Sequence, residues 1–166
     1  DFPVDNDFRR IGIIQDPYEY GSTTFASSGT LRGTKVAKIN GATANYVVDE
    51  MVTQTVAGGT AKGTVVSWDA TNGILKYFQT PSLHADSGVV RAFASDAANS
   101  VDGAVSTASG TVDTTQDAPL ADISFTGGLA SPEIEPNSGE VVYIENRRQI
   151  TRAPDQIEDI KLVIEF

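Results

Sequence analysis

The sequence predicts an all-β fold, mainly antiparallel, with a sandwich or small-barrel architecture, a hairpin-rich inserted module and little helix. Two observations support this prediction. The apolar residues of the 166-residue chain are mostly Val, Ile and Ala, and Gly, Ser and Thr are abundant, which suits strands and turns. Short apolar runs alternate with turn signals at close intervals, and no stretch has the periodicity of a long amphipathic helix.

The first expected strand lies within residues 7–17, which read DFRRIGIIQDP. Ile11, Ile13 and Ile14 are β-branched, and Pro17 ends the run because proline lacks the backbone donor that a strand ladder needs. The following segment, 18–33, has the Gly, Ser and Thr content of a loop or of a crossing between units.

The clearest strand pattern covers residues 34–80. The runs TKVAKI, NYVVDEMVTQTV, AKGTVVSWD and ILKYFQT are separated by Asn40-Gly41, Gly58-Gly59 and Asn72-Gly73, and the last run stops at Pro81. Asn-Gly and Gly-Gly pairs accept the positive φ angles of tight hairpin turns. The pattern therefore predicts antiparallel hairpins in a small barrel or sandwich.

Strand signals are weaker in the next part of the chain. Residues 88–96 and 121–128 are candidate strands that end in polar or glycine-containing stretches. Between them, residues 96–119 are low in apolar residues and rich in Asp, Ser, Thr and Gly, which predicts an acidic loop.

The C-terminal part contains two further expected strands. Residues 131–139, with two prolines, read as an extended linker, and 140–150 read as a strand. At the C-terminus Ile160, Leu162 and Ile164 alternate with mostly polar residues, as in a half-buried strand, after one helical turn in APDQIED. We therefore expect a scaffold sheet from residues 1–24 and 131–166, with 25–130 as an inserted β module.

The charge balance argues against a nucleic-acid partner. The net charge is −10, and Arg91 is the one basic residue between Pro81 and Glu140, so that an acidic surface would repel phosphates. There are no cysteines, which excludes disulfides and thiolate metal sites, and no apolar run reaches the roughly 20 residues that span a bilayer. The chain begins at Asp1 without a leader pattern, and we expect it to be a piece of a longer protein.

No catalytic pattern stands out. The sole histidine, His84, lies in the polar stretch TPSLHADSG without a G-x-S-x-G elbow, so we expect neither a catalytic triad nor a cofactor. Asp96, Asp102, Asp113 and Asp117 offer oxygen ligands for calcium, but their spacing follows a calcium loop only loosely and a solvated loop is favoured. GGTAKGT lacks the spacing of a phosphate-binding loop.

A dense charge cluster lies near the C-terminus, in YIENRRQITRAPDQIED. Arginine pairs with carboxylates through a planar fork, and such pairs fix geometry. The interleaved signs argue against a nucleic-acid patch and predict an ion-paired segment at the base of a sheet or at a subunit interface. The residues of interest are Glu145, Asn146, Arg147, Arg148, Arg152, Asp155, Glu158 and Asp159.

The two ends of the chain resemble the gene-product-eight type of baseplate wedge subunit of contractile-tailed, T-even-like bacteriophages. At the C-terminal end the resemblance rests on Ser138-Gly139-Glu140, Tyr143, Glu145-Asn146-Arg147, Ile150, Asp155-Gln156, Glu158 and the apolar strand that ends at Phe166. At the N-terminal end it rests on Phe8-Arg9, Ile11 and the apolar run that ends at Pro17. Together these segments cover about a third of the chain, and the middle departs from the family pattern.

The resemblance implies a non-enzymatic structural protein of the virion, assembled in the bacterial host cytoplasm. It implies other wedge subunits as partners, and a homodimer. Interface or structural ion-pair candidates are Glu145, Asn146, Arg147, Arg152, Asp155 and Glu158. An ion pair or hydrogen bond within the chain is an equal alternative for each of these residues.

Two other functions stay open from the residues alone. The inserted module is a candidate adhesin-like or carbohydrate-binding sandwich, which would need exposed aromatic residues on a concave face. The available aromatic residues are Tyr46, Trp68, Tyr77 and Phe78, and strand alternation places some of them in a core. A hydrolase that uses paired acids is the least favoured reading, because carboxylate spacing alone carries no information in an acidic β protein.

Overall fold

The computed structural model describes residues 9–27 and 31–147. It divides into two compact units, one made of residues 1–17 and 139–166 and the other of residues 18–138. We call them the ribbon unit and the barrel unit. Both are built from antiparallel strands, so the predicted all-β fold class is confirmed.

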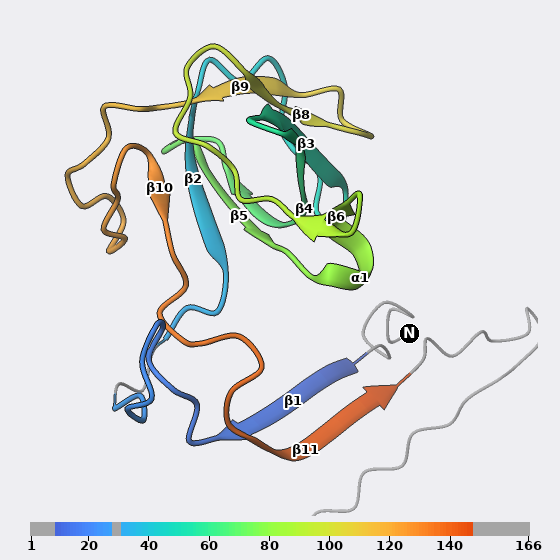
Figure 1. The fold of residues 1–166 in the computed structure, drawn as a ribbon, viewed down its shortest axis with the longest axis vertical. Helices are drawn as coiled ribbons and strands as arrows, with labels where there is room; N and C mark the ends of the chain where they lie inside the picture. The colour runs from blue at the N-terminus through green and yellow to red at the C-terminus, as the bar shows by residue number, and fades with distance from the viewer. Residues whose placement is uncertain (1–8, 28–30, 148–166) are drawn as a thin grey trace, which may run out of the picture. The chain divides into compact units, whose positions relative to one another are not determined.

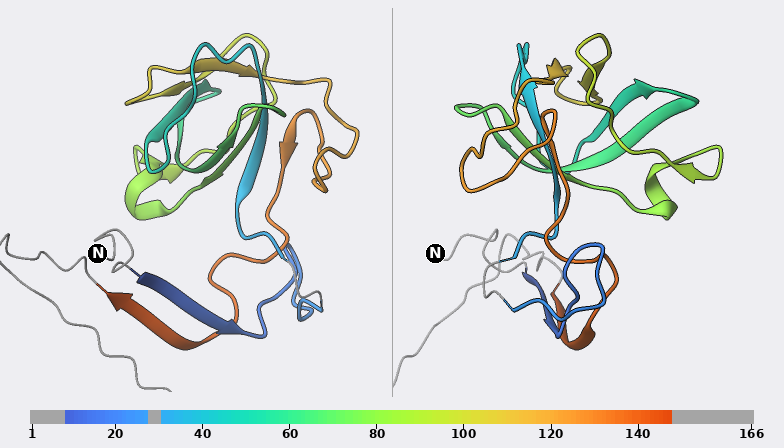
Figure 2. Two further views of the ribbon diagram at one scale, coloured as in Figure 1. Left: turned by 180° about the vertical axis from the view of Figure 1, so that it is seen from behind. Right: turned by 60° about the vertical axis from the view of Figure 1, so that its left-hand side comes forward.

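The ribbon unit contains a two-stranded antiparallel sheet, which we call the ribbon. Its strands are β1, Arg9–Gln15, and β11, Glu140–Arg147, which lie side by side in Figures 1 and 2. The register pairs Ile11 with Glu145 and shifts between Ile13 and Ile14. The pairing of β1 with β11 joins segments from both parts of the chain from which a shared sheet was expected, whereas the strand expected at residues 160–164 lies outside the described residues.

The barrel unit is built around six strands that close into a barrel (Figure 1). The order is β2-β5-β4-β3-β8-β9, and β9 returns to pair with β2 at Ile39 and Asn40. An interior of this size is filled by side chains. The strands are β2, Lys35–Asn40; β3, Met51–Val56; β4, Gly59–Asp69; β5, Ile74–Phe78; β8, Ser100–Gly103; and β9, Ser109–Val112.

Shorter elements complete the barrel unit. Helix α1, Pro81–His84, leads into the small hairpin of β6, Ala85–Asp86, and β7, Val89–Val90. Strand β10, Leu129–Ala130, pairs with β2 outside the closed ring. Among the described residues, no helix has the length and apolar character required to cross a membrane.

Strand β4 shows how the sequence fills the barrel. Its buried residues alternate as Ala61, Gly63 and Val65, which is the period of a strand with one face inward. The ladder with β5 shifts between Val65 and Ser67, so that Trp68 comes opposite the buried Leu75. The bulge therefore turns Trp68 toward the core, where it packs against the buried cluster.

The main core lies inside the barrel and a smaller one lies against the outer side of β2 and β5. The smaller cluster combines Val36 and Ile74 with Ile123 and Phe125. The main cluster contains Ala37, Ile39, Tyr46, Val52, Ala61, Val65, Leu75, Tyr77, Phe93, Val101, Ala108 and Val112.

The acidic segment 96–119 was expected as a loop, and this prediction is wrong for its central part. Residues 100–103 and 109–112 form β8 and β9, which complete the barrel. Val101 and Val112 supply the buried face. Gly110 lies against β2, because a Cβ built there would be 2.5 Å from Cγ2 of Ile39. A small residue is thus required where β9 lies close against β2. A prediction based on apolar content does not recognise strands that contain such small residues.

The two candidate strands on either side of β8 and β9 are also corrected. In residues 88–96 the described strand is limited to β7. The residues after β7 are held by side-chain hydrogen bonds, from Gln54 to the backbone of Ala94 and from Gln79 to the carbonyl of Arg91. In 121–128 two isolated bridges and positive φ angles at Ala121 and Asp122 replace a regular strand. Its apolar residues are instead buried in the smaller cluster.

Candidate functional site

The ribbon presents a large apolar surface. Among its large apolar side chains the exposed fractions range from 44% for Ile11 to 69% for Ile144. Exposed apolar residues on both strands are unusual for a soluble surface and mark interaction sites when they are contiguous. The residues are Ile11, Ile13, Ile14, Val141, Val142, Tyr143 and Ile144.

The predicted charge cluster is only partly placed. Glu145, Asn146 and Arg147 form the end of β11, where the register sets them opposite Ile11, Arg10 and Arg9. Glu145 is half-buried. Arg148, Arg152, Asp155, Glu158 and Asp159 lie outside the described residues, so the expected ion pairs stay a prediction.

The four aspartates considered for calcium do not converge in the described part of the chain, where no group of three or more metal-ligating side chains occurs. Each carboxylate instead accepts local hydrogen bonds: Asp96 from Asn99, Asp102 from Ser109, Asp113 from Thr115 and Asp117 from the N–H of Gly127. Asp102 and Ser109 are paired across β8 and β9, so this bond links two strands of the barrel, whereas Asp96 and Asp113 bond to residues two or three positions further along the chain.

His84 is buried, which corrects the expectation of a histidine in a polar loop. It ends α1 and is fully inaccessible, with its ring edge-on to Phe78 at a centroid distance of 5.4 Å. Its Nδ1 accepts the N–H of Thr80 at 2.8 Å, and its Nε2 lies 2.8 Å from Oγ1 of Thr64. Burial lowers its pKa, so the ring is a neutral structural group and not an accessible base.

The aromatic residues named for a binding module divide into buried and accessible ones. Tyr46 and Tyr77 are 4% exposed and belong to the core. Trp68 and Phe78 are half-buried. Tyr77 lines one open hollow of the barrel unit and Trp68 lines another, so these two hollows are the candidate ligand-binding sites.

The larger hollow, of about 620 Å³, contains two desolvated cations. Burial lowers the pKa of Lys35, whose Nζ donates to Oε1 of Gln79 at 2.8 Å. Burial also lowers the pKa of Arg32, and the nearby Glu133 partly offsets this effect. Arg32 donates to the carbonyls of Thr34 and Ser131, and its Nη2 lies 3.9 Å from Glu133.

These contacts give the larger hollow a structural role. Glu133 accepts the N–H of Arg32 at 2.6 Å and its own N–H donates to the Arg32 carbonyl at 2.7 Å, so two segments remote in sequence are held together. Nε of Arg32 and Oγ1 of Thr34 are buried without a partner among the described residues. Asp122 and Glu133 share the lining, which disfavours an anionic ligand beside the two cations.

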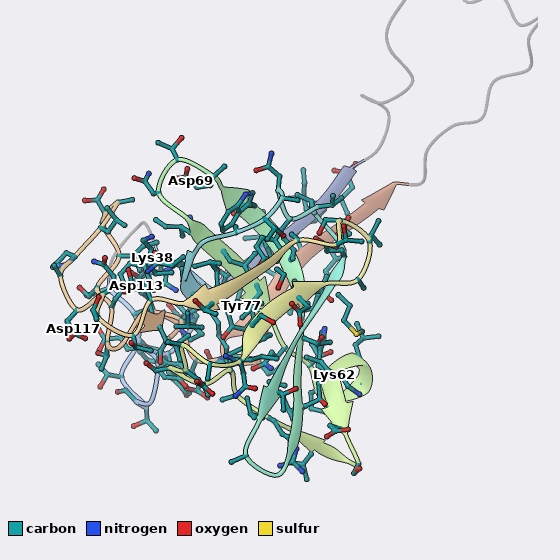
Figure 3. The ribbon with its side chains drawn as sticks, turned by 90° about the horizontal axis from the view of Figure 1, so that it is seen from above. Lys38, Lys62, Asp69, Tyr77, Asp113 and Asp117 are labelled. Atoms are coloured by element: carbon teal, nitrogen blue, oxygen red, sulfur yellow. The ribbon has the colours of Figure 1, made fainter. Side chains whose placement is uncertain are left out.

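The second hollow, of about 440 Å³, lies at one end of the barrel. It is lined by Trp68, by Lys38 and by the two Asn-Gly turns that end β2 and precede β5. The sequence identified these pairs as turns, but nothing in the sequence alone indicated that they share a hollow. Lys38 is labelled in Figure 3 beside Asp113, whose N–H donates to the Lys38 carbonyl.

Comparisons with protein-family models, with curated proteins and with solved structures found no match to this chain.

Proposed function

We propose that this protein is a structural component of a bacteriophage tail baseplate wedge, which acts through protein–protein contacts in virion assembly. The observation that carries the proposal is the apolar surface of the ribbon. It combines seven exposed apolar residues on two short strands. No catalytic role is part of the proposal.

The ribbon has the properties of an incomplete sheet. A two-stranded sheet is marginally stable in water unless further strands or a packing partner cover it. In the described part of the chain β1 and β11 pair only with each other, so each strand has one edge without a ladder partner. Such edges accept a strand from a neighbouring chain, and the exposed apolar side chains add specificity to that pairing.

The register places apolar residues on both faces. Ile13 is opposite Tyr143, and on the other side of the register shift Ile14 is opposite Val141. Directly opposed residues share a face, and the face alternates along a strand. Covering one face alone would thus leave the other exposed, which favours a partner that surrounds the ribbon, as within a multi-subunit assembly.

The resemblance and the ribbon involve the same residues. The family-like positions Tyr143 and Glu145 lie on β11, and Arg9 and Ile11 lie on the paired strand β1. This coincidence supports a contact role for the segments that resemble the wedge subunits. We propose neighbouring wedge subunits as the partners, and a homodimer is the alternative outcome.

The ribbon surface is tested by Ile144→Glu in the virus that encodes this chain. Ile144 is 69% exposed, so the substitution should change the free energy of unfolding of the free protein by no more than about 0.5 kcal/mol. Burial of the carboxylate in a subunit contact would be strongly unfavourable. We expect normal amounts of folded protein and a large loss of completed tails in electron micrographs.

Leu83→Glu is the matched control, because Leu83 is 59% exposed and lies on α1 of the barrel unit. It should leave tail assembly unchanged. Equal tail yields for Ile144→Glu and the unchanged protein would rule out the ribbon as the assembly contact.

A further inference from the structure

The hollow at the end of the barrel has the composition of a saccharide site. Barrel ends are frequent ligand sites, and polar side chains around an aromatic ring suit a ligand with many hydroxyl groups. The lining combines Trp68 with amide and hydroxyl side chains from two turns. Those polar residues are Asn40, Asn45, Thr71 and Asn72.

The indole of Trp68 is held in a fixed orientation. Its Nε1 donates to Oδ1 of Asn45 at 3.0 Å, and its ring meets Tyr46 at a centroid distance of 5.0 Å and an interplanar angle of 73°. Because Trp68 packs against the barrel core, little conformational entropy is left to lose when a ligand contacts the ring.

The neighbouring amides keep hydrogen-bonding capacity. Asn45 uses its Oδ1 for the indole, and its Nδ2 has no hydrogen-bond partner within residues 9–27 and 31–147. Asn72 donates its Nδ2 to Asp69 at 2.7 Å, which leaves its Oδ1 as an acceptor in that same part of the chain. One donor group and one acceptor beside an aromatic ring match the paired donor and acceptor character of sugar hydroxyls.

The charge of the lining favours a neutral ligand. Among the residues that the structure describes, Lys38 is the one charged residue that lines this hollow, and its Nζ lies 3.4 Å from Oδ1 of Asn40. Asp113 is close enough to Lys38 for the lysine charge to contribute to the lowering of the Asp113 pKa, after the larger effect of the Thr115 hydrogen bond. With a net charge of −10 on the chain, an anionic ligand would gain little from this single cation.

We propose that this hollow binds a neutral saccharide, with Trp68 as the stacking surface and Asn45 and Asn72 as the hydrogen-bonding side chains. The site lies wholly within the barrel unit and is independent of the proposed assembly role of the ribbon. A structural protein of a virion with such a site would contact glycans through the barrel.

The test uses the fact that Trp68 is the only tryptophan in the chain. The full chain is first applied to a printed array of neutral and acidic oligosaccharides, and the neutral saccharide that binds best is then titrated while tryptophan fluorescence is recorded. We expect a saturable change in fluorescence. Asn45→Ala and Asn72→Ala should each weaken binding by about tenfold, as expected for a lost hydrogen bond.

Tyr20→Ala is the control, because Tyr20 is an exposed aromatic residue that lines the other hollow. It should leave binding unchanged. Asn45 is exposed, so its variant keeps the test valid even if Asn72→Ala weakens the Asp69 turn. Absence of binding to every neutral saccharide, binding of acidic saccharides alone, or binding lost in Tyr20→Ala but kept in Asn45→Ala would each overturn the proposal.

Discussion

Replacement of Glu50 by alanine should lower the free energy of unfolding of the barrel unit by about 3 kcal/mol. Glu50 is 3% exposed and its carboxylate accepts four hydrogen bonds. The N–H of Val47 and the hydroxyl of Ser106 each donate to Oε1 at 2.7 Å. The N–H groups of Val105 and Ser106 donate to Oε2 at 2.9 and 2.8 Å. Alanine would leave all four donors without this acceptor.

Urea denaturation followed by the fluorescence of Trp68 measures this loss, because Trp68 packs on the barrel core. Glu50→Gln is the matched variant: it keeps the shape but replaces one acceptor oxygen with a donor, and we expect an intermediate loss. Unchanged stability in Glu50→Ala would mean that the carboxylate does not hold the β8–β9 turn to the segment before β3.

Glu50 also predicts a dependence on pH. Burial raises its pKa, but the bonds from Ser106, Val47 and Val105 outweigh this effect, so the pKa lies below its ordinary value. The stabilisation is therefore complete above the ordinary glutamate pKa of about 4.3 and is lost as the pH falls through the lower folded value. The unfolding free energy of Glu50→Gln should fall less over this acidic range than that of the unchanged protein.

Gly128→Ala should be comparably destabilising, by about 3 kcal/mol, because strain and overlap act together. Gly128 has φ of +77°, and a Cβ built there would lie 2.3 Å from the Asp113 carbonyl oxygen. The backbone of Gly128 cannot move away without loss of hydrogen bonds, since its N–H donates to the Gln116 carbonyl and its own carbonyl accepts the N–H of Lys38 at 2.7 Å.

Gly88→Ala separates the two causes. Gly88 has φ of +83°, but nothing lies within 4 Å of a Cβ built there. It should cost about 1 kcal/mol, the usual penalty for a side chain in the left-handed region. Equal unfolding free energies for the two variants would contradict the close approach of the Gly128 and Asp113 backbones.

The hairpins of residues 34–80 were predictable because the local signals agree. Gly58-Gly59 and Asn72-Gly73 punctuate apolar runs of strand length, and both lie at the turns that join β3 to β4 and β4 to β5. Asn40-Gly41 is also a turn, but β2 pairs with β5 and β9 instead of β3. Turn chemistry fixes where a strand ends, whereas its partner depends on contacts remote in sequence.

The features that the sequence did not reveal depend on tertiary packing. In the single turn of α1, His84 is buried and its neighbour Leu83 is 59% exposed. This is the opposite of what the hydrophobicity of the two residues suggests. Glu50 resembles every other acid of an acidic chain until the donors around it are known. The proposed saccharide site combines residues from two separate segments, 38–45 and 68–73, and only the barrel brings Asn45 to the same hollow as Trp68 and Asn72.

The central proposal, that this chain is a structural part of a tail baseplate, is tested most directly on purified virions of the bacteriophage in which the proposal places its gene. Mass spectrometry should find the chain in the particles. An antibody against the barrel unit should label the end of the tail in electron micrographs. Particles that contain complete tails but lack the chain would contradict the claim.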